Sequence, residues 1–189
     1  VNALLSFQLS DKDALYVTAY NSSDRFSFNT DTAYSYQNLN LNIKWNRSLY
    51  NNGQREFTIG YDQYKYEVDG KITYKAIADA FNMEYKLSQY YGMWHQVYKK
   101  GLKNTYEFGA KANFIQIQPG NLNPTSLESL VNGKILENEQ ALETSLYFSN
   151  NYLVNDQLSV DWGIRYTLYN YLGAKTVRYY ENDDNKSSH

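Results

Sequence analysis

Histidine and cysteine are the side chains most able to hold a metal or attack a substrate, and this chain carries almost none of them. It has no cysteine and two histidines, His95 and His189. Without cysteine, a disulfide framework, a thiolate metal site and a cysteine nucleophile are excluded. His95 has no second histidine at metal-ligand spacing and stands beside Trp94, so we predict a solvated turn residue there. The sequence also lacks a G-x-S-x-G motif and a glycine-rich phosphate loop. We therefore expect no enzyme activity, no metal and no cofactor.

The charge balance and the tyrosine content narrow the class of protein further. With 18 basic and 20 acidic residues the formal net charge is −2, so no summed positive field favours a nucleic-acid partner. No stretch approaches the roughly 20 apolar residues of a membrane-spanning helix. Tyrosine occurs 21 times, and aromatic residues favour strands. A membrane β-barrel stays compatible with this polar composition, because each of its strands needs an apolar face on one side only.

In the segments that would position any site, apolar and polar residues alternate almost throughout. The clearest case is residues 158–168 (LSVDWGIRYTL), where leucine, valine, tryptophan, isoleucine and tyrosine alternate with polar residues. About eight such strands are expected, several of them longer than is usual in soluble sheets. The expected strands cover residues 1–9, 14–21, 39–49, 57–63, 77–87, 106–114, 142–152 and 158–168. For residues 14–21, both Leu15, Val17, Ala19 and the alternate set Tyr16, Thr18, Tyr20 remain candidates for the outward face.

Two kinds of connection should lie at opposite rims if the strands simply run up and down. Short or polar turns are expected at residues 10–13, 50–53, 89–104 and 155–157. Longer connections are expected at residues 22–32, 67–73, 119–138 and after Gly173. Membrane barrels have short periplasmic turns and longer extracellular loops, so the second rim is expected to be extracellular. The loop 119–138 is a candidate for ligand or partner contact, or else a lid that packs on the rim. Gln63 and Asp79 interrupt apolar faces and should lie above the membrane or beside a bulge.

Polar faces of these strands supply the candidate binding residues. Tyrosines that alternate with outward positions are candidates to face the lumen, and the neighbouring charges could line a transport path. Alternatively, the charges pair across strands, and the aromatic surplus forms girdles at the two membrane interfaces. The charged polar-face positions are Glu84, Lys86, Glu107, Lys111, Glu143, Asp161 and Arg165. The candidate ligand-binding or lumen-facing residues are Tyr147, Tyr169, Tyr171, Glu143, Asp161 and Arg165.

A family resemblance appears in the second half of the chain. It is carried by residues 107–111 (EFGAK), 119–122 (PGNL), 139–143 (EQALE), 145–147 (SLY), 163–166 (GIRY) and 171–173 (YLG). These runs resemble the barrel of TonB-dependent outer-membrane receptors, specifically from residue 106 to 173 and in strand order from about residue 15 to 180. The resemblance implies a 22-stranded barrel around an amino-terminal plug domain that imports a scarce ligand with energy from the inner membrane. The chain is far shorter than such a receptor and shows no plug or TonB box.

The sequence therefore predicts an all-β fold, an antiparallel transmembrane β-barrel segment of about eight strands within a larger barrel, over residues 1–189. No signal-peptide pattern opens the chain, and its end is polar, so a mature chain or an internal fragment is expected. The predicted function is the wall of an active importer in the bacterial outer membrane. Expected partners are outer-membrane lipid and lipopolysaccharide, the plug domain and TonB energising complex that the resemblance implies, and a surface lipoprotein as a further candidate. The alternative is a complete eight-stranded barrel acting as an adhesin or anchor; a soluble all-β enzyme is disfavoured.

Overall fold

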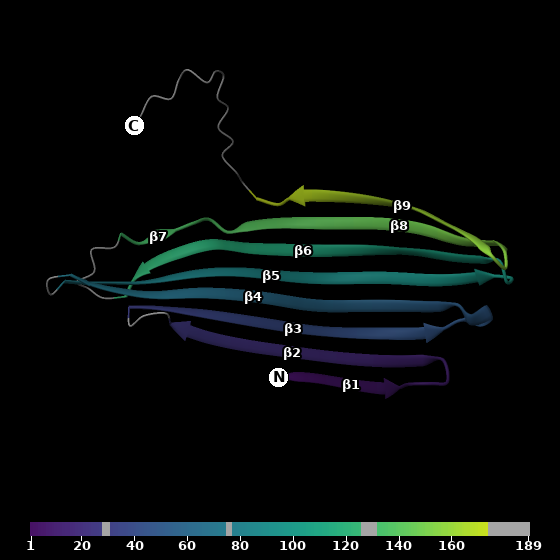
Figure 1. The fold of residues 1–189 in the computed structure, drawn as a ribbon, viewed down its shortest axis with the longest axis horizontal. Helices are drawn as coiled ribbons and strands as arrows, with labels where there is room; N and C mark the ends of the chain where they lie inside the picture. The colour runs from purple at the N-terminus through teal and green to yellow at the C-terminus, as the bar shows by residue number, and fades with distance from the viewer. Residues whose placement is uncertain (28–30, 75–76, 126–131, 174–189) are drawn as a thin grey trace, which may run out of the picture.

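A computed structural model describes residues 1–27, 31–74, 77–125 and 132–173, with only the backbone described at residues 51, 71–74 and 77–80. These residues form one antiparallel sheet of nine strands (Figure 1). No helix in the described residues is long and apolar enough to cross a membrane. The strands are β1 (Asn2–Gln8), β2 (Asp13–Ser27), β3 (Thr32–Ser48), β4 (Gln54–Tyr74), β5 (Ile77–Lys100), β6 (Asn104–Pro124), β7 (Lys134–Ile135), β8 (Glu139–Asn155) and β9 (Leu158–Tyr171), with a short 3-10 turn at Tyr50–Asn52.

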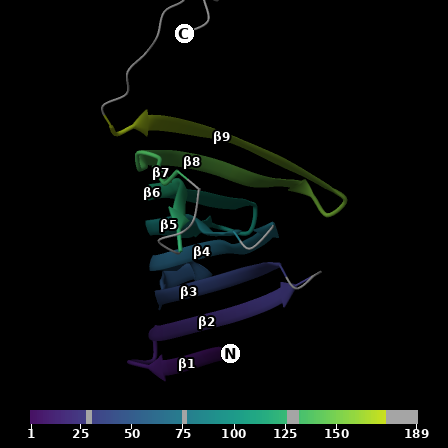
Figure 2. The same cartoon turned by 90° about the vertical axis from the view of Figure 1, so that its left-hand side faces the viewer.

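The sheet is a meander in which each long strand pairs with the next along the chain. Its order is β1-β2-β3-β4-β5-β6-β8-β9, and the short β7 pairs with β6. β1 and β9 lie at opposite edges, and no ladder joins them in the described residues (Figures 1 and 2). The sheet is therefore open, as is expected if the chain is a segment of a larger barrel, whose first and last strands do not pair with each other.

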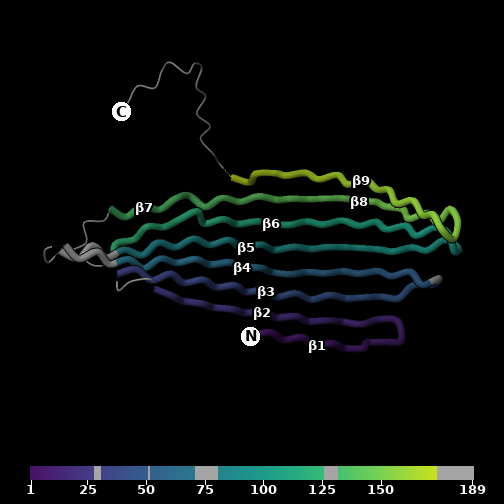
Figure 3. Tube along the Cα trace, in the orientation of Figure 1, coloured from purple at the N-terminus to yellow at the C-terminus, as the bar shows by residue number. Residues whose placement is uncertain are grey.

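The two ends of the sheet differ as the alternating connections predict. The turns β1–β2, β3–β4, β5–β6 and β8–β9 lie at one end, and the strand ends at which β2 leads to β3, β4 to β5 and β6 to β8 lie at the other (Figure 3). We call these the turn end and the loop end. Residues 126–131 of the long connection and the tail from residue 174, both expected at the loop end, lie outside the described residues.

Strands run further than predicted, above all β5. Residues 89–104 were expected to form a polar turn, but β5 continues to Lys100, and only residues 101–103 turn back, with Gly101 at a φ of 64°. In the first part of this strand the apolar residues stand at odd-numbered positions, such as Phe81 and Tyr85, and in the second part at even-numbered positions, such as Tyr90 and Trp94. A search for apolar residues at every second position therefore stops near residue 87, although the strand continues. Similarly, β2, β3 and β4 extend through most of the predicted loops 22–32 and 67–73.

A bulge at residues 119–120 adjusts the register between β5 and β6. Glu84 pairs with Asn121 and Lys86 with Gln118, so two intervening residues of β6 oppose one residue of β5. Gly120 has a φ of 150°, a conformation that L side chains rarely adopt and glycine tolerates. Because of the extra residue, the odd-numbered residues of β6 beyond the bulge lie on the side that its even-numbered residues occupy before it.

The register decides which side chains share a face. Leu15 stands opposite Trp45 and Val17 opposite Ile43, so the open choice in residues 14–21 resolves to Leu15, Val17 and Ala19 on the apolar face. Directly paired residues carry this face across every long strand. We call the two sides the apolar face and the polar face. The apolar face holds Ala3, Leu5 and Phe7; Leu15, Val17 and Ala19; Leu39, Leu41, Ile43 and Trp45; Phe57, Ile59 and Tyr61; Tyr90, Gly92 and Trp94; Phe108, Ala110, Ala112 and Phe114; Leu142, Leu146 and Phe148; and Val160, Trp162, Ile164, Tyr166 and Leu168.

Burial in this sheet is the reverse of that in a water-soluble sheet. On the apolar face Ile59 is 62% exposed and Leu146 62%, and no described element covers them. On the polar face Thr58 is 7% exposed and Ser145 3%. Among the described residues, only Val68 and Ala141 are buried hydrophobic side chains. At these central positions, the polar face is shielded and the apolar face is uncovered.

Candidate functional site on the polar face

His95 and Tyr147 form the most specific contact on the polar face. His95 of β5 was predicted to be a solvated turn residue, and this is wrong: it is half-buried, and its Nδ1 lies 2.6 Å from the hydroxyl of Tyr147 in β8. The two rings also stack, with centroids 6.0 Å apart. Between them runs β6, where Gly109 pairs directly with both residues. A Cβ at Gly109 would stand 2.5 Å from the Tyr147 hydroxyl, so the glycine leaves the space that lets Tyr147 reach across to β5.

Arg165 approaches the same tyrosine from the other side. It pairs directly with Tyr147, its guanidinium carbon lies 5.9 Å from the ring centroid, and its Nη2 donates to Ser145 Oγ at 3.0 Å. A cation at this distance from an aromatic ring is attracted by the ring quadrupole. His95, Tyr147 and Arg165 thus form a row across four strands, which we call the Tyr147 row.

The other predicted site residues share this face but do not join the row. Glu143 stands opposite Tyr169, and Ala141 stands opposite Tyr171. Asp161 accepts a hydrogen bond from Asn151 Nδ2 at 2.5 Å. All six candidates therefore lie on the polar face, as the alternation predicted, along β8 and β9.

Two of the charged residues were assigned to the wrong face. Glu84 and Lys86 lie on the apolar side, because they are an even number of residues from Tyr90 and Trp94 on the same strand. The pairing of Lys86 with Lys65 places them on that side as well. The expected ion pairing across strands holds for Glu84, which lies 3.5 Å from Lys65 Nζ. The described ion pairs include none of the remaining positions, Glu107, Lys111, Glu143, Asp161 and Arg165.

An aromatic cluster at the loop end of the polar face was missed in the sequence. Tyr36 stacks on Tyr66 at 5.0 Å and on Phe26 at 5.8 Å, and Phe26 also stacks on Tyr34 at 5.3 Å. Burial raises the pKa of Tyr66 above its ordinary value, with a further contribution from the neighbouring tyrosines. The available signal was the spacing of two between Tyr34 and Tyr36, which lie between the predicted loop 22–32 and the predicted strand 39–49.

Two belts of aromatic rings cross the apolar face. Toward the loop end, Tyr90 lies 4.7 Å from Tyr61 and 6.4 Å from Phe114, measured between ring centroids. Toward the turn end one chain of contacts joins Trp45, Phe57, Trp94 and Phe108, and another joins Tyr98, Tyr106, Phe148 and Trp162. Aromatic residues with one apolar and one polar edge are favoured where an apolar phase meets water.

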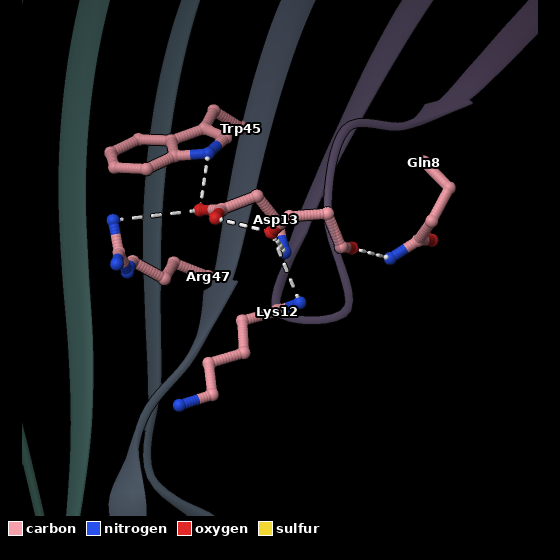
Figure 4. A network of polar contacts seen from close by, with 6 residues as sticks. Gln8, Lys12, Asp13, Trp45 and Arg47 are labelled. Atoms are coloured by element: carbon pink, nitrogen blue, oxygen red, sulfur yellow. Dashed lines mark hydrogen bonds and ion pairs between the residues drawn. The ribbon is translucent and has the colours of Figure 1, made fainter.

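Polar groups begin immediately beyond each belt. At the turn end, Trp45 Nε1 donates to Asp13 Oδ1 at 3.1 Å, and Arg47 lies 3.8 Å from the same carboxylate oxygen (Figure 4). At the loop end a row of directly paired polar residues, Gln63, Ser88, Gln116 and Gln140, crosses four strands. The apolar face is therefore a band with a polar margin on each side. Gln63 lies in this margin rather than beside the bulge, and the side chain of Asp79 lies outside the described residues.

Beyond the loop-end margin, the same face carries ion pairs. Lys65 Nζ lies 2.8 Å from Glu67 and 3.5 Å from Glu84, and Arg25 lies 3.2 Å from Asp69. The hydrogen bond to Glu67, reinforced by the charge of Glu84, raises the pKa of Lys65 despite partial desolvation. This end of the sheet is polar on the side where the middle is apolar.

No protein-family model, curated protein or solved structure matches this chain. Within the described residues, no group of three or more His, Cys, Asp or Glu side chains is placed to hold a metal ion. The assignment of function therefore depends on the faces of the sheet and on the contacts within them.

Proposed function

We propose that this chain forms part of the wall of a TonB-dependent importer in the bacterial outer membrane. The observation that carries the proposal is the uncovered apolar band with aromatic belts at both margins. A soluble sheet with about the same composition would bury this face against another layer, since burying apolar area is the main force of folding. Lipid is the environment in which an outward apolar face and an enclosed polar face are both stable.

The height of the band supports a membrane-spanning wall. On β5 the rings of Tyr90 and Tyr98 mark the two belts, and on β6 Phe114 and Tyr106 do so. Eight residues of extended strand span roughly 27 Å, close to the apolar band of about 25 Å in outer-membrane barrels. The three longest strands have 21, 24 and 21 residues, more than the about 9 to 11 that a bilayer requires. Their excess continues beyond the polar margin at the loop end, as expected of strands that extend above the membrane.

The open edges favour the larger barrel over a complete eight-stranded one. A barrel of eight strands must pair its first and last strands to satisfy their backbone groups in lipid. β1 and β9 are unpaired along their outer sides in the described residues. In the proposed importer, further strands continue the sheet from both edges, and the ligand specific to this segment contacts the polar face at the Tyr147 row or near Tyr169 and Tyr171.

Site-directed spin labelling tests the membrane embedding directly. Val160 and Asp161 are neighbours in β9 and lie on opposite faces. In vesicles, a label at Val160 is expected to be accessible to a lipid-soluble relaxant and a label at Asp161 to a water-soluble one. Ser159 and Trp162 form a second pair that should repeat the difference with the faces in reverse order. Equal accessibility within both pairs would contradict the proposal.

A further inference from the structure

A polar pocket of about 210 Å³ opens on the apolar face at the loop-end margin. Its floor is Ser88, which is 5% exposed, and its wall includes the hydroxyl of Tyr61, which accepts a hydrogen bond from Gln63 and lies 3.5 Å from Ser88 Oγ. Lys86 on β5 contributes its cation. The amide side chains that line the pocket are Gln116, Gln118, Asn138 and Gln140. The pocket therefore offers one positive charge and several neutral hydrogen-bond donors at the edge of an apolar band.

The charge of Lys86 has no compensating partner in the described residues. Lys65 stands directly opposite it, and that lysine lies within 2.8 Å of Glu67 and 3.5 Å of Glu84. Both nearby carboxylates are thus engaged by Lys65. No ion pair or hydrogen bond to the Lys86 side chain occurs among the described residues. A half-buried lysine without a carboxylate partner, directly opposite a second lysine, favours an anionic ligand.

An apolar hollow of about 740 Å³ lies beside this pocket, on the side toward the middle of the band. Tyr61 and Tyr90 line both the pocket and the hollow. The hollow arises because Gly92 and Ala112 are small and pair side by side, with larger side chains around them. A Cβ built at Gly92 would have no heavy atom within 4 Å, so the space above it is open.

We propose that this pocket and hollow bind a phosphorylated glycolipid of the outer leaflet, with a phosphate on Lys86 and an acyl chain over Gly92. The inference rests on the proposed membrane embedding and adds a specific lipid site to it. The contiguity of the two parts points to one amphipathic molecule, since a free anion would fill the pocket alone. The amide donors suit a sugar headgroup, and the loop end is the side proposed to face outside, where such lipids lie.

Lipid titration of matched lysine variants tests the headgroup site. The complete polypeptide that carries this chain is purified in mild detergent, and binding of lipid A and of phosphatidylethanolamine is followed by native mass spectrometry. Lys86→Gln should raise the Kd for lipid A about tenfold, the effect of ~1.4 kcal/mol, and change phosphatidylethanolamine binding little. Lys100→Gln is the control, because Lys100 lies on the same strand and face at the turn end. Excess inorganic phosphate should leave lipid A bound.

A second variant tests the acyl-chain hollow without touching the charge. Gly92→Leu fills the open space that the acyl chain would occupy. It should raise the Kd for lipid A several-fold, because the chain loses its contact with this part of the hollow. Heat-modifiable migration on a gel shows that the variant is folded.

The outcomes separate this inference from the proposed function. Lipid A binding by Lys86→Gln that equals wild type, or complete displacement of lipid A by inorganic phosphate, would overturn the lipid site. If the spin labels in β9 show no lipid contact, the membrane proposal itself fails. If the spin labels show lipid contact but lipid A and phosphatidylethanolamine bind equally well, the lipid site is overturned and the membrane proposal stands.

Discussion

Two neighbouring residues of β4 show how differently the two faces of this sheet are built. Ile59 on the apolar face is 62% exposed, whereas Thr58 on the polar face is 7% exposed. The contacts described on the apolar face are its aromatic belts and the polar and ionic pairs at its two margins. The polar face is a network of cross-strand hydrogen bonds, among them Thr18 Oγ1 to Asn42 Oδ1 at 2.9 Å and Asn113 Nδ2 to Gln89 at 3.2 Å. Stability should therefore depend on the surrounding solvent at the apolar face and on close contacts at the polar face.

The largest expected effect comes from placing a charge inside the apolar band. Ile59→Arg should reduce the free energy of unfolding in lipid vesicles by about 2 to 3 kcal/mol, because the guanidinium would lie between the bilayer midplane, where the cost is about 2 to 4 kcal/mol, and the loop-end belt at Tyr61 and Tyr90. In a water-soluble sheet the same change at an exposed site would cost within about 0.5 kcal/mol. Urea titration monitored by tryptophan fluorescence measures the difference.

Leu4 supplies the matched control for this comparison. Its exposure, 64%, is close to the 62% of Ile59, but it lies on the polar face, where Thr18 is its direct partner. Leu4→Arg should change the unfolding free energy by no more than about 0.5 kcal/mol. A similar cost at both positions would mean that the two faces meet the same solvent.

A second comparison uses glycines on opposite faces. A Cβ at Gly109 would stand 2.4 Å from the carbonyl oxygen of Trp94 and 2.5 Å from the Tyr147 hydroxyl, whereas one at Gly92 meets nothing within 4 Å. Gly109→Ala should therefore cost about 1 to 3 kcal/mol through overpacking. Gly92→Ala should be neutral or stabilise by up to about 1 kcal/mol, since it restricts the unfolded chain. Equal changes in the free energy of unfolding in urea titrations would show that the close packing around Gly109 does not contribute to stability.

The Tyr147 hydroxyl should contribute a smaller amount. Tyr147→Phe removes the hydrogen bond with His95 and should cost about 0.5 to 1.5 kcal/mol. Tyr169→Phe on the same face is the control, because no hydrogen bond to the Tyr169 hydroxyl occurs among the described residues. The imidazole signals of His95 in NMR spectra should shift in the first variant and stay in place in the second. An unchanged His95 spectrum in Tyr147→Phe would contradict the contact.

The smallest expected effect concerns the ion pairs beyond the loop-end margin. Lys65→Met should cost about 0.2 to 1 kcal/mol, because the side chain is partly exposed. The raised pKa of Lys65 means that its contribution is complete below the unfolded pKa of about 10.4 and is lost as pH rises through the folded value. The difference between wild type and Lys65→Met should then shrink above about pH 10.4. A difference that stays constant to higher pH, or that grows, would show that Lys65 acts by packing.

Eight of the nine strands, all but the two-residue β7, and the faces of the six candidate residues could be predicted from local pattern. In residues 39–46, 106–114 and 158–168, apolar residues recur at every second position, and in residues 142–152 they do so at four of six such positions. This is the interval at which side chains of a strand return to one face. Tyr147 and Arg165 were assigned to the polar face for this reason, and the structure confirms it. The aromatic cluster around Tyr36 escaped prediction because its apolar rings lie on the polar face, opposite to the pattern of the band.

The sequence alone determined that most of the chain forms strands with one apolar and one polar side, because that property depends only on the order of neighbouring residues. Tertiary structure decided which side of β2 and of β5 joins the apolar band, since the register with the adjacent strands sets this. It also brought His95 to Tyr147, 52 residues away along the chain. No local pattern contains that contact, because it depends on the pairing of β5 with β6 and of β6 with β8, and on a glycine in the strand between them.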